Sequence, residues 1–223
     1  MSKPTFRRVF AYIIDVLIVA IISAALATLP FFKKYYTKYE ENSNRYVELL
    51  NEASQSPEKM NQLLNDDNIK DITYDVSKSG VFISIINLVI SVLYFVVFQY
   101  ITNGKTGGKA LFKIEVAPIN DKKVRLSHII KRSLIVNRLI FSLLSILLIL
   151  CLSKSSYINY SPYLEIVDLG IMLLTFGMII YNDNGQGLHD KFAHTQVILS
   201  EEREYFYKNN KKVKEAKIVK DNK

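Results

Sequence analysis

Four long apolar runs constrain this chain more than any other feature. They cover residues 9–32, 81–101, 134–152 and 163–181. Each run approaches the ~20 residues that a helix needs to cross ~30 Å of hydrocarbon. A lone strand in lipid would leave its backbone polar groups unpaired, so the runs are expected to be helices. The sequence therefore predicts an all-α integral membrane protein with four transmembrane helices.

The positive charges predict how these spans are oriented. Three basic residues precede the first span, eight lie within 102–133 and nine within 182–223, whereas 153–162 holds only Lys154. The longer segment 33–80 holds seven basic and nine acidic residues. Because Lys and Arg accumulate in cytoplasmic loops, both termini are predicted to be cytoplasmic. This distribution explains the net charge of +8 without nucleic-acid binding, and it fits a multi-pass protein of a bacterial cell membrane.

The segments outside the spans complete the expected domain organisation. Residues 5–199 are predicted to form one transmembrane domain, which includes 33–80 as an extracytoplasmic helical insertion. Ser56 and Pro57 have the residue types of a helix start, so a small helical hairpin is expected there. Residues 200–223 form a basic tail, which is expected to be attracted to anionic lipids of the inner leaflet.

One aspartate, Asp15, lies inside the first span. An unpaired aspartate at mid-membrane costs ~2.5–3.5 kcal/mol on insertion scales, so Asp15 is expected to face the helix bundle. Arg8 lies seven residues earlier on the same helical face, and we expect its side chain to reach the inner headgroups. Arg138, near the start of the third span, has a suitable depth to pair with Asp15, and Gln99 could join them.

A second acidic residue, Asp168, lies in the outer part of the fourth span. Asn87, in the outer half of the second span, could accompany it. Two acidic residues near opposite membrane faces would suit a path for a cation or a proton. The alternative is that Asp15 and Asp168 stabilise the helix bundle and carry no ion.

The stretch TNGKTGGKALFKIEV, residues 102–116, follows the second span directly. Its glycines allow a tight turn, but it lacks the full spacing of a phosphate-binding P-loop. Apolar and polar residues then alternate on both sides of Asn120 and Asp121. This pattern predicts a short cytoplasmic hairpin at the membrane surface.

The stretch NDNGQGLHDKFAHTQVIL, residues 182–199, follows the last span. His189, Asp190 and His194 are candidate metal ligands, but their spacing matches no known zinc pattern. A hydrogen-bonded turn is the favoured interpretation, so no metal and no cofactor are predicted. The chain also has no convincing nucleophile–base pair, and we expect no enzymatic activity.

Taken together, these stretches resemble the RDD family of bacterial membrane proteins. The matching residues occur in four groups along the chain, and they are Arg8, Ala11 and Asp15; then Gly104, Thr106, Gly108 and Lys109; then Arg132; and finally Gly187, Asp190, Lys191, Ala193, Thr195 and Val197. The resemblance covers about 5–32 and 80–199. It implies a modest functional expectation, because cation/proton antiport has been associated with some members.

Two functions follow from these observations. The first is a transport-related membrane protein that exchanges Na⁺ or K⁺ for H⁺ by means of its intramembrane carboxylates. Since four helices make a small transporter, a homo-oligomer is expected in that case. The alternative is a non-transporting scaffold or assembly factor whose cytoplasmic face binds a partner or lipid headgroups.

Overall fold

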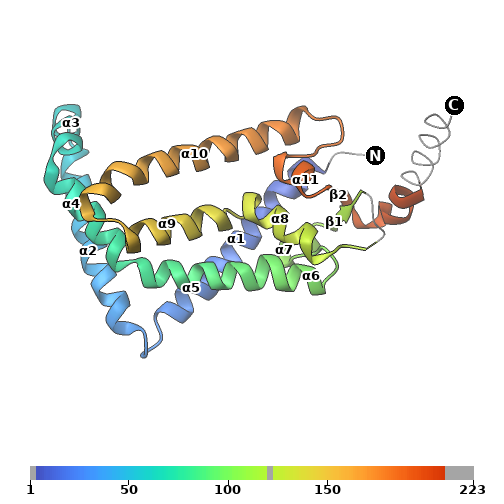
Figure 1. The fold of residues 1–223 in the computed structure, drawn as a ribbon, viewed down its shortest axis with the longest axis horizontal. Coiled ribbons are helices and arrows are strands. Elements are labelled where there is room, and N and C mark those ends of the chain that lie inside the picture. The colour runs from blue at the N-terminus through green and yellow to red at the C-terminus, as the bar shows by residue number, and fades with distance from the viewer. Residues whose placement is uncertain (1–3, 120–122, 209–223) are drawn as a thin grey trace. The chain divides into compact units, whose positions relative to one another are not determined.

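The computed structural model describes residues 4–119 and 123–208, and the chain is mostly helical (Figure 1). Its helices and strands are, in order, α1 (Thr5–Ala27), α2 (Lys33–Ala53), α3 (Pro57–Asn65), α4 (Asp67–Ser79), α5 (Val81–Val92), the π-helical segment η1 (Leu93–Phe98), α6 (Gln99–Ile101), α7 (Gly107–Leu111), β1 (Ile114–Pro118), α8 (Leu126–Val136), α9 (Leu139–Cys151), α10 (Lys154–Tyr181), α11 (Leu188–Phe192), β2 (Thr195–Leu199) and the 3₁₀ turn η2 (Ser200–Glu202).

Among the described residues, three helices are long and apolar enough to cross a membrane, namely Thr5–Ala27, Val81–Ile101 and Lys154–Tyr181. A fourth candidate is the pair α8 and α9, which is bent by 61°. The predicted set of membrane-spanning helices is therefore confirmed for three or four members.

Two details of the predicted spans are wrong. The break between α8 and α9 falls at Asn137 and Arg138, and Arg138 has a left-handed backbone with φ 55°. Apolar residues flank this break on both sides, so the two polar residues were included in one predicted span. The last helix begins at Lys154, so the loop expected at 153–162 is helical almost throughout. Polar residues in that stretch mask its helical character in a hydropathy profile.

The chain divides into two compact units. The first unit contains Met1–Val19, Ser91–Leu139 and Leu169–Lys223, and the second contains Ala20–Ile90 and Ile140–Asp168.

The second unit includes the predicted helical insertion. In it α2 packs against α4, and the short α3 connects them. Ser56 caps α3 by accepting a hydrogen bond from the Lys59 amide at 3.2 Å, with Pro57 in the first turn as the sequence predicted. Lys154 pairs with Asp71 at 2.8 Å, which ties the start of α10 to α4. The insertion is thus a helical hairpin with one additional short helix.

The first unit contains a two-stranded sheet. Strand β1 pairs antiparallel with β2, so that Ile114 lies opposite Leu199 and Pro118 opposite Thr195. The hairpin predicted around Asn120 and Asp121 is therefore wrong, although these two residues lie outside the described part of the chain. The alternation of apolar residues identifies a strand but not its partner, and here the partner follows the last span.

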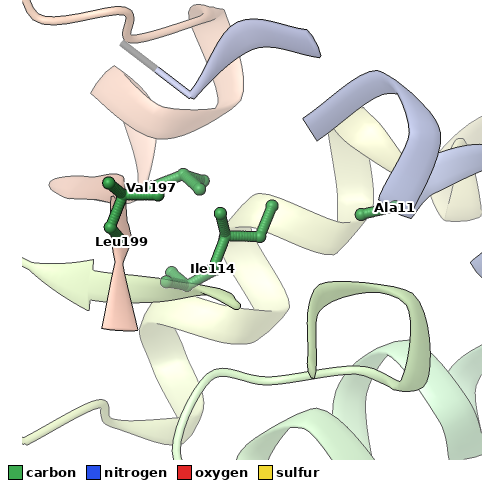
Figure 2. Packing of buried hydrophobic residues seen from close by; sticks show 5 residues of the cluster. Ala11, Ile114, Val197 and Leu199 are labelled. Atoms are coloured by element: carbon green, nitrogen blue, oxygen red, sulfur yellow. The ribbon is translucent and has the colours of Figure 1, made fainter. Parts of the chain in front are cut away.

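Both faces of this sheet are covered. On one face, Ile114 and Val116 of β1 pack with Val197 and Leu199 of β2 and with Ala11 of α1 (Figure 2). On the other face, Ala117 and Ile198 pack with Phe206, which follows β2 in the chain. This double coverage explains why all five residues of β1 are buried. It also fixes α1 beside the sheet at Ala11.

Candidate functional site

The Asp15 carboxylate is the first of two buried acidic centres in the first unit. It is fully buried. Its Oδ1 accepts hydrogen bonds from the Tyr94 hydroxyl and the Gly108 amide, both at 2.7 Å. Its Oδ2 accepts one from the Thr106 hydroxyl at 2.5 Å and lies 3.6 Å from Lys109 Nζ. Both oxygens are therefore hydrogen-bonded, and a lysine balances the charge.

Two irregular pieces of backbone bring these donors together. Thr106 caps α7, because its hydroxyl accepts a hydrogen bond from the Lys109 amide at 3.4 Å. Tyr94 lies in the π-helical segment η1, and such segments insert an extra residue into a helical turn. The Tyr94 hydroxyl also accepts a hydrogen bond from the Gly107 amide at 2.9 Å. The phenol thus links the second apolar helix to α7 directly beside Asp15.

Gly108 allows α7 to approach α1 closely. A Cβ at this position would collide with the Ala11 carbonyl oxygen and would lie 2.9 Å from Asp15 Oδ1. The obstacle is partly backbone, so it cannot be relieved by rotating a side chain. The glycine is required by this contact between the two helices.

Gly108→Ala is expected to destabilise the protein by about 1–3 kcal/mol, the usual cost of overpacking. Gly177→Ala in α10 is the matched control, because no atom lies within 4 Å of its added methyl group. An alanine there is expected to leave stability unchanged or to raise it by up to about 1 kcal/mol. Thermal unfolding of both variants in detergent measures the difference. Equal midpoints would contradict the close approach at Ala11.

Asp190 is the second buried acidic centre. Its Oδ2 lies 2.5 Å from Arg8 Nη2, and its Oδ1 pairs with Arg132 Nη1. The carboxylate also accepts hydrogen bonds from the Gly187 amide at 3.2 Å and from the Thr195 hydroxyl at 3.3 Å. Asp190 is fully buried. One carboxylate therefore lies between two arginines that come from distant parts of the chain.

The neighbouring elements explain this placement. Asp190 is the third residue of α11, so its side chain reaches back to the N-cap amide of Gly187. Arg8 also donates from Nη1 to the Gly185 carbonyl oxygen. Helix α8 carries Arg132, and Ser133 beside it donates to the Phe95 carbonyl at 3.1 Å. Helices α1, α8 and α11 thus meet at a single carboxylate.

His189 fills the space beside this carboxylate. Its side chain is almost completely buried, and its Nε2 lies 3.4 Å from Arg8 Nη2 and 3.3 Å from Asp190 Oδ2. Burial lowers the pKa of His189 well below its usual value of 6.5, and the charges of Arg132, Arg8 and Lys109 lower it further. His189 is therefore neutral, and its Nε2 lies between the Arg8 guanidinium and the Asp190 carboxylate.

Lys109 is the cation of the network that loses its proton most readily. Burial lowers its pKa from 10.5 to about 8. The Asp15 carboxylate opposes this shift, whereas the charges of Arg132 and Arg8 add to it. Arginine stays protonated in proteins, whereas a lysine with this pKa releases its proton at about pH 8.

Several residues singled out from the sequence lie in places other than those expected. Arg8 pairs with Asp190 instead of reaching for headgroups. The ion-pair partner that the structure gives Asp15 is Lys109, whereas Arg138 lies exposed at the break between α8 and α9. Gln99 is buried as expected, but its side chain donates to the Gly104 carbonyl at 3.3 Å and so holds the turn before α7.

The two residues expected near the outer face lie in the second unit. Asp168 is buried in α10 and exposes only 5% of its surface. Asn87 is exposed on α5. Of the candidate metal ligands, His194 is exposed while His189 and Asp190 are buried. Within residues 4–119 and 123–208 no group of three His, Cys, Asp or Glu side chains is arranged to hold a metal ion.

Two buried polar contacts were missed by reasoning from the sequence. Tyr94 was one apolar-span residue among many, and its hydroxyl donates to Asp15 from the π-helical segment η1. Glu115 is buried in β1, where its carboxylate lies 3.3 Å from Lys105 Nζ and 2.5 Å from Arg203 Nε. A lone glutamate inside the apolar strand IEVAP was a signal that could have been used.

The helices and the buried charges together define a multi-pass helical membrane protein with an ordered ionic network in one of its units. The model of the RDD family matches residues 3–194, so the chain belongs to the RDD family. This match confirms the resemblance found in the motifs. Comparison with curated proteins and with solved structures found no match.

Proposed function

We propose that this protein exchanges a monovalent cation for a proton at the pair formed by Asp15 and Lys109. The observation that carries the proposal is a carboxylate buried within a membrane-spanning helix beside a lysine whose pKa is about 8. Ionisable residues inside membrane segments typically mark ion paths and proton relays. A cation that takes the place of the lysine ammonium would displace one proton into solution.

The charge balance of the network supports this exchange. Arg8, Arg132 and Lys109 supply three positive charges, and Asp15 and Asp190 supply two negative charges. If a monovalent cation enters while Lys109 loses its proton, the net charge of the buried network stays the same. An exchange of this kind avoids the high cost of adding an uncompensated charge to a buried site.

The oxygens around Asp15 are suitable ligands for a hard cation. Its carboxylate and the hydroxyls of Thr106 and Tyr94 lie within one cluster. Oxygen ligands of this kind are those that hard cations prefer. We propose Na⁺ or K⁺ as the cation, because a single carboxylate and neutral hydroxyls match a single positive charge.

The proposed orientation places this network at the cytoplasmic side of a bacterial cell membrane. The basic segments that follow the second and the last spans support it, since such segments stay in the cytoplasm. Asp168 would then be an outer station of the path, and copies of the chain would associate into a homo-oligomer. We propose transport and no enzymatic activity.

Purified protein in liposomes tests the proposal. With a pH-sensitive dye inside and a Na⁺ or K⁺ gradient imposed, native protein is expected to move protons in the direction opposite to the cation. Asp15→Asn and Lys109→Met are expected to abolish this flux, and Asp168→Asn to reduce it. Asp183→Asn is the control, because Asp183 is exposed in the loop before α11. The absence of cation-dependent flux in native protein would refute the exchange.

A second function is favoured because both buried carboxylates already have partners for all of their oxygens. Every oxygen of Asp15 and Asp190 has a hydrogen-bond or ion-pair partner. Such a network suits a rigid scaffold that presents its cytoplasmic face to a partner or to lipid headgroups. Under this alternative, native protein gives no flux, Asp15→Asn loses folding, and crosslinking retrieves one soluble partner in a fixed ratio.

A further inference from the structure

Residues 100–118 and 181–199 contain the same structural landmarks at the same spacing. Each stretch follows a membrane-spanning helix and includes a glycine with positive φ, Gly104 at 93° and Gly185 at 62°. A five-residue helix comes next, α7 in the first stretch and α11 in the second. Both stretches then have one left-handed residue, Lys113 at 54° and His194 at 51°, and a five-residue strand. Equivalent positions are 81 residues apart throughout, as Gly185 is from Gly104.

The pairing of β1 with β2 has a local two-fold axis. Val116 of β1 lies opposite Val197 of β2, and these two residues are also 81 positions apart. Ile114 and Pro118 at the two ends of β1 lie opposite the equivalents of each other. The axis therefore passes between the two valines. Identical residues occupy only a few equivalent positions, namely Tyr100 and Tyr181, Asn103 and Asn184, Gly104 and Gly185, and Val116 and Val197.

Helix α1 contacts the two stretches with opposite charges. Lys109 and Asp190 occupy equivalent positions, each the third residue of its short helix. Lys109 pairs with Asp15 of α1, and Asp190 pairs with Arg8 of α1. Seven residues separate Arg8 from Asp15, so both side chains lie on one face of the helix. The same face of α1 therefore presents a negative charge to the first stretch and a positive charge to the second.

A second difference between the stretches lies one residue earlier. Gly108 and His189 are equivalent, and Gly108 brings α7 against the backbone of α1 at Ala11. In the other stretch the His189 ring fills the corresponding position and contacts Arg8. Helix α7 therefore contacts α1 through its backbone at Gly108 as well as through Lys109, whereas α11 contacts α1 through the side chains of His189 and Asp190.

We infer that residues 100–118 and 181–199 are two copies of one helix–strand unit, and that the pairs Asp15–Lys109 and Arg8–Asp190 form one electrostatically coupled site shared by both copies. The first copy carries the exchangeable proton, and the second copy sets how tightly that proton is held. The functional part rests on the proposed cation exchange, whereas the coupling itself does not. Transporters built from internal repeats also place their ion sites where the repeats meet.

The groups that face Lys109 come from every element around it. Helix α1 contributes Asp15 and Arg8 and helix α8 contributes Arg132, while Asp190 of α11 pairs with both arginines and neutral His189 lies beside it. Each charged group should therefore shift the pKa of Lys109 in a direction fixed by its sign. Loss of the Asp190 charge should lower it, and loss of the Arg8 charge should raise it.

The titration of Lys109 tests this coupling without any transported ion. Lys109 is labelled with an amine-reactive reagent in detergent and choline chloride between pH 6 and 11, and labelling is quantified by mass spectrometry. We expect a lower apparent pKa in Asp190→Asn and a higher one in Arg8→Gln, each by at least a few tenths of a unit. Glu115→Gln is the matched control, because it removes a carboxylate that is equally buried but lies on the other face of the sheet.

The outcomes separate the inference from the proposed function. Opposite shifts in Asp190→Asn and Arg8→Gln, with no shift in Glu115→Gln, support the shared site even if native protein moves no ions. An unfolded variant is recognised by the loss of a cooperative melting transition and by labelling near the ordinary lysine pKa. In that event Arg8→Gln, which leaves Asp190 paired with Arg132, carries the test through the expected rise of the Lys109 pKa. An unchanged pKa of Lys109 in folded Asp190→Asn or in folded Arg8→Gln overturns the inference.

Discussion

Asp190→Asn is expected to cost the protein most of its stability. The substitution removes the carboxylate that lies between Arg8 and Arg132, and both guanidinium groups then remain buried without a counter-ion. Breaking a buried ion pair from one side typically costs about 3–5 kcal/mol, and here two cations lose the same partner. Native proteins are stable by only about 5–15 kcal/mol, so we expect little folded material. The yield of monodisperse protein and its melting midpoint in detergent measure this effect.

Two variants calibrate that result. Asp183→Asn removes the same charge from an exposed position in the loop before α11 and is expected to leave the midpoint unchanged. Thr195→Val removes one hydrogen bond to Asp190 but keeps its charge, and is expected to cost about 1 kcal/mol. If Asp190→Asn folds as well as Asp183→Asn, the carboxylate does not hold α1, α8 and α11 together.

The membrane-spanning helices were predictable because they depend on local composition. A run of about 20 apolar residues has few alternatives to a helix in lipid, and three such helices appear near their predicted positions. The break at Asn137 and Arg138 was not predictable in this way, because two polar residues between apolar runs do not by themselves fix the backbone angles that end a helix. Likewise, the polar start of α10 is helical although its composition resembles a loop.

The partners of the charged residues were not predictable from helix depth alone. Depth suggested Arg138 for Asp15, and headgroups for Arg8. The structure instead pairs Arg8 with Asp190, which is 182 residues further along the chain. Asp190 belongs to the stretch that ends in β2, and the pairing of β2 with β1 over such a distance leaves no local pattern in the sequence. The sequence therefore singled out charged residues that the structure brings together, but it did not indicate which of them pair.

The spacing between the two motif stretches did contain usable information. Both have a glycine, a short helix and a strand in the same order, with equivalent positions 81 residues apart. Few residues are identical between them, so a search for sequence repeats has little to detect. The equivalence becomes visible when the left-handed residues and the strand register are known. Backbone conformation thus preserves a similarity that the side chains have largely lost.

The affinity for Na⁺ is expected to depend on pH with a slope set by one proton. A cation at Asp15 competes with the protonated form of Lys109, whose pKa is about 8. Below that pH the lysine must first release its proton, so the apparent affinity should fall about tenfold for each unit of pH. Above it the lysine is already neutral, and the affinity should no longer change.

Stabilisation by ligand binding gives a direct measurement of this slope. The melting midpoint in detergent is recorded at pH 6, 7, 8 and 9 while NaCl replaces choline chloride at constant ionic strength, since a ligand that binds the native state raises its stability. Lys109→Met should bind Na⁺ with an affinity independent of pH, because no proton is displaced there. Asp15→Asn should show no difference between the two salts. A slope that persists in Lys109→Met would mean that another group releases the proton, and the exchange would then have to be assigned to a different pair.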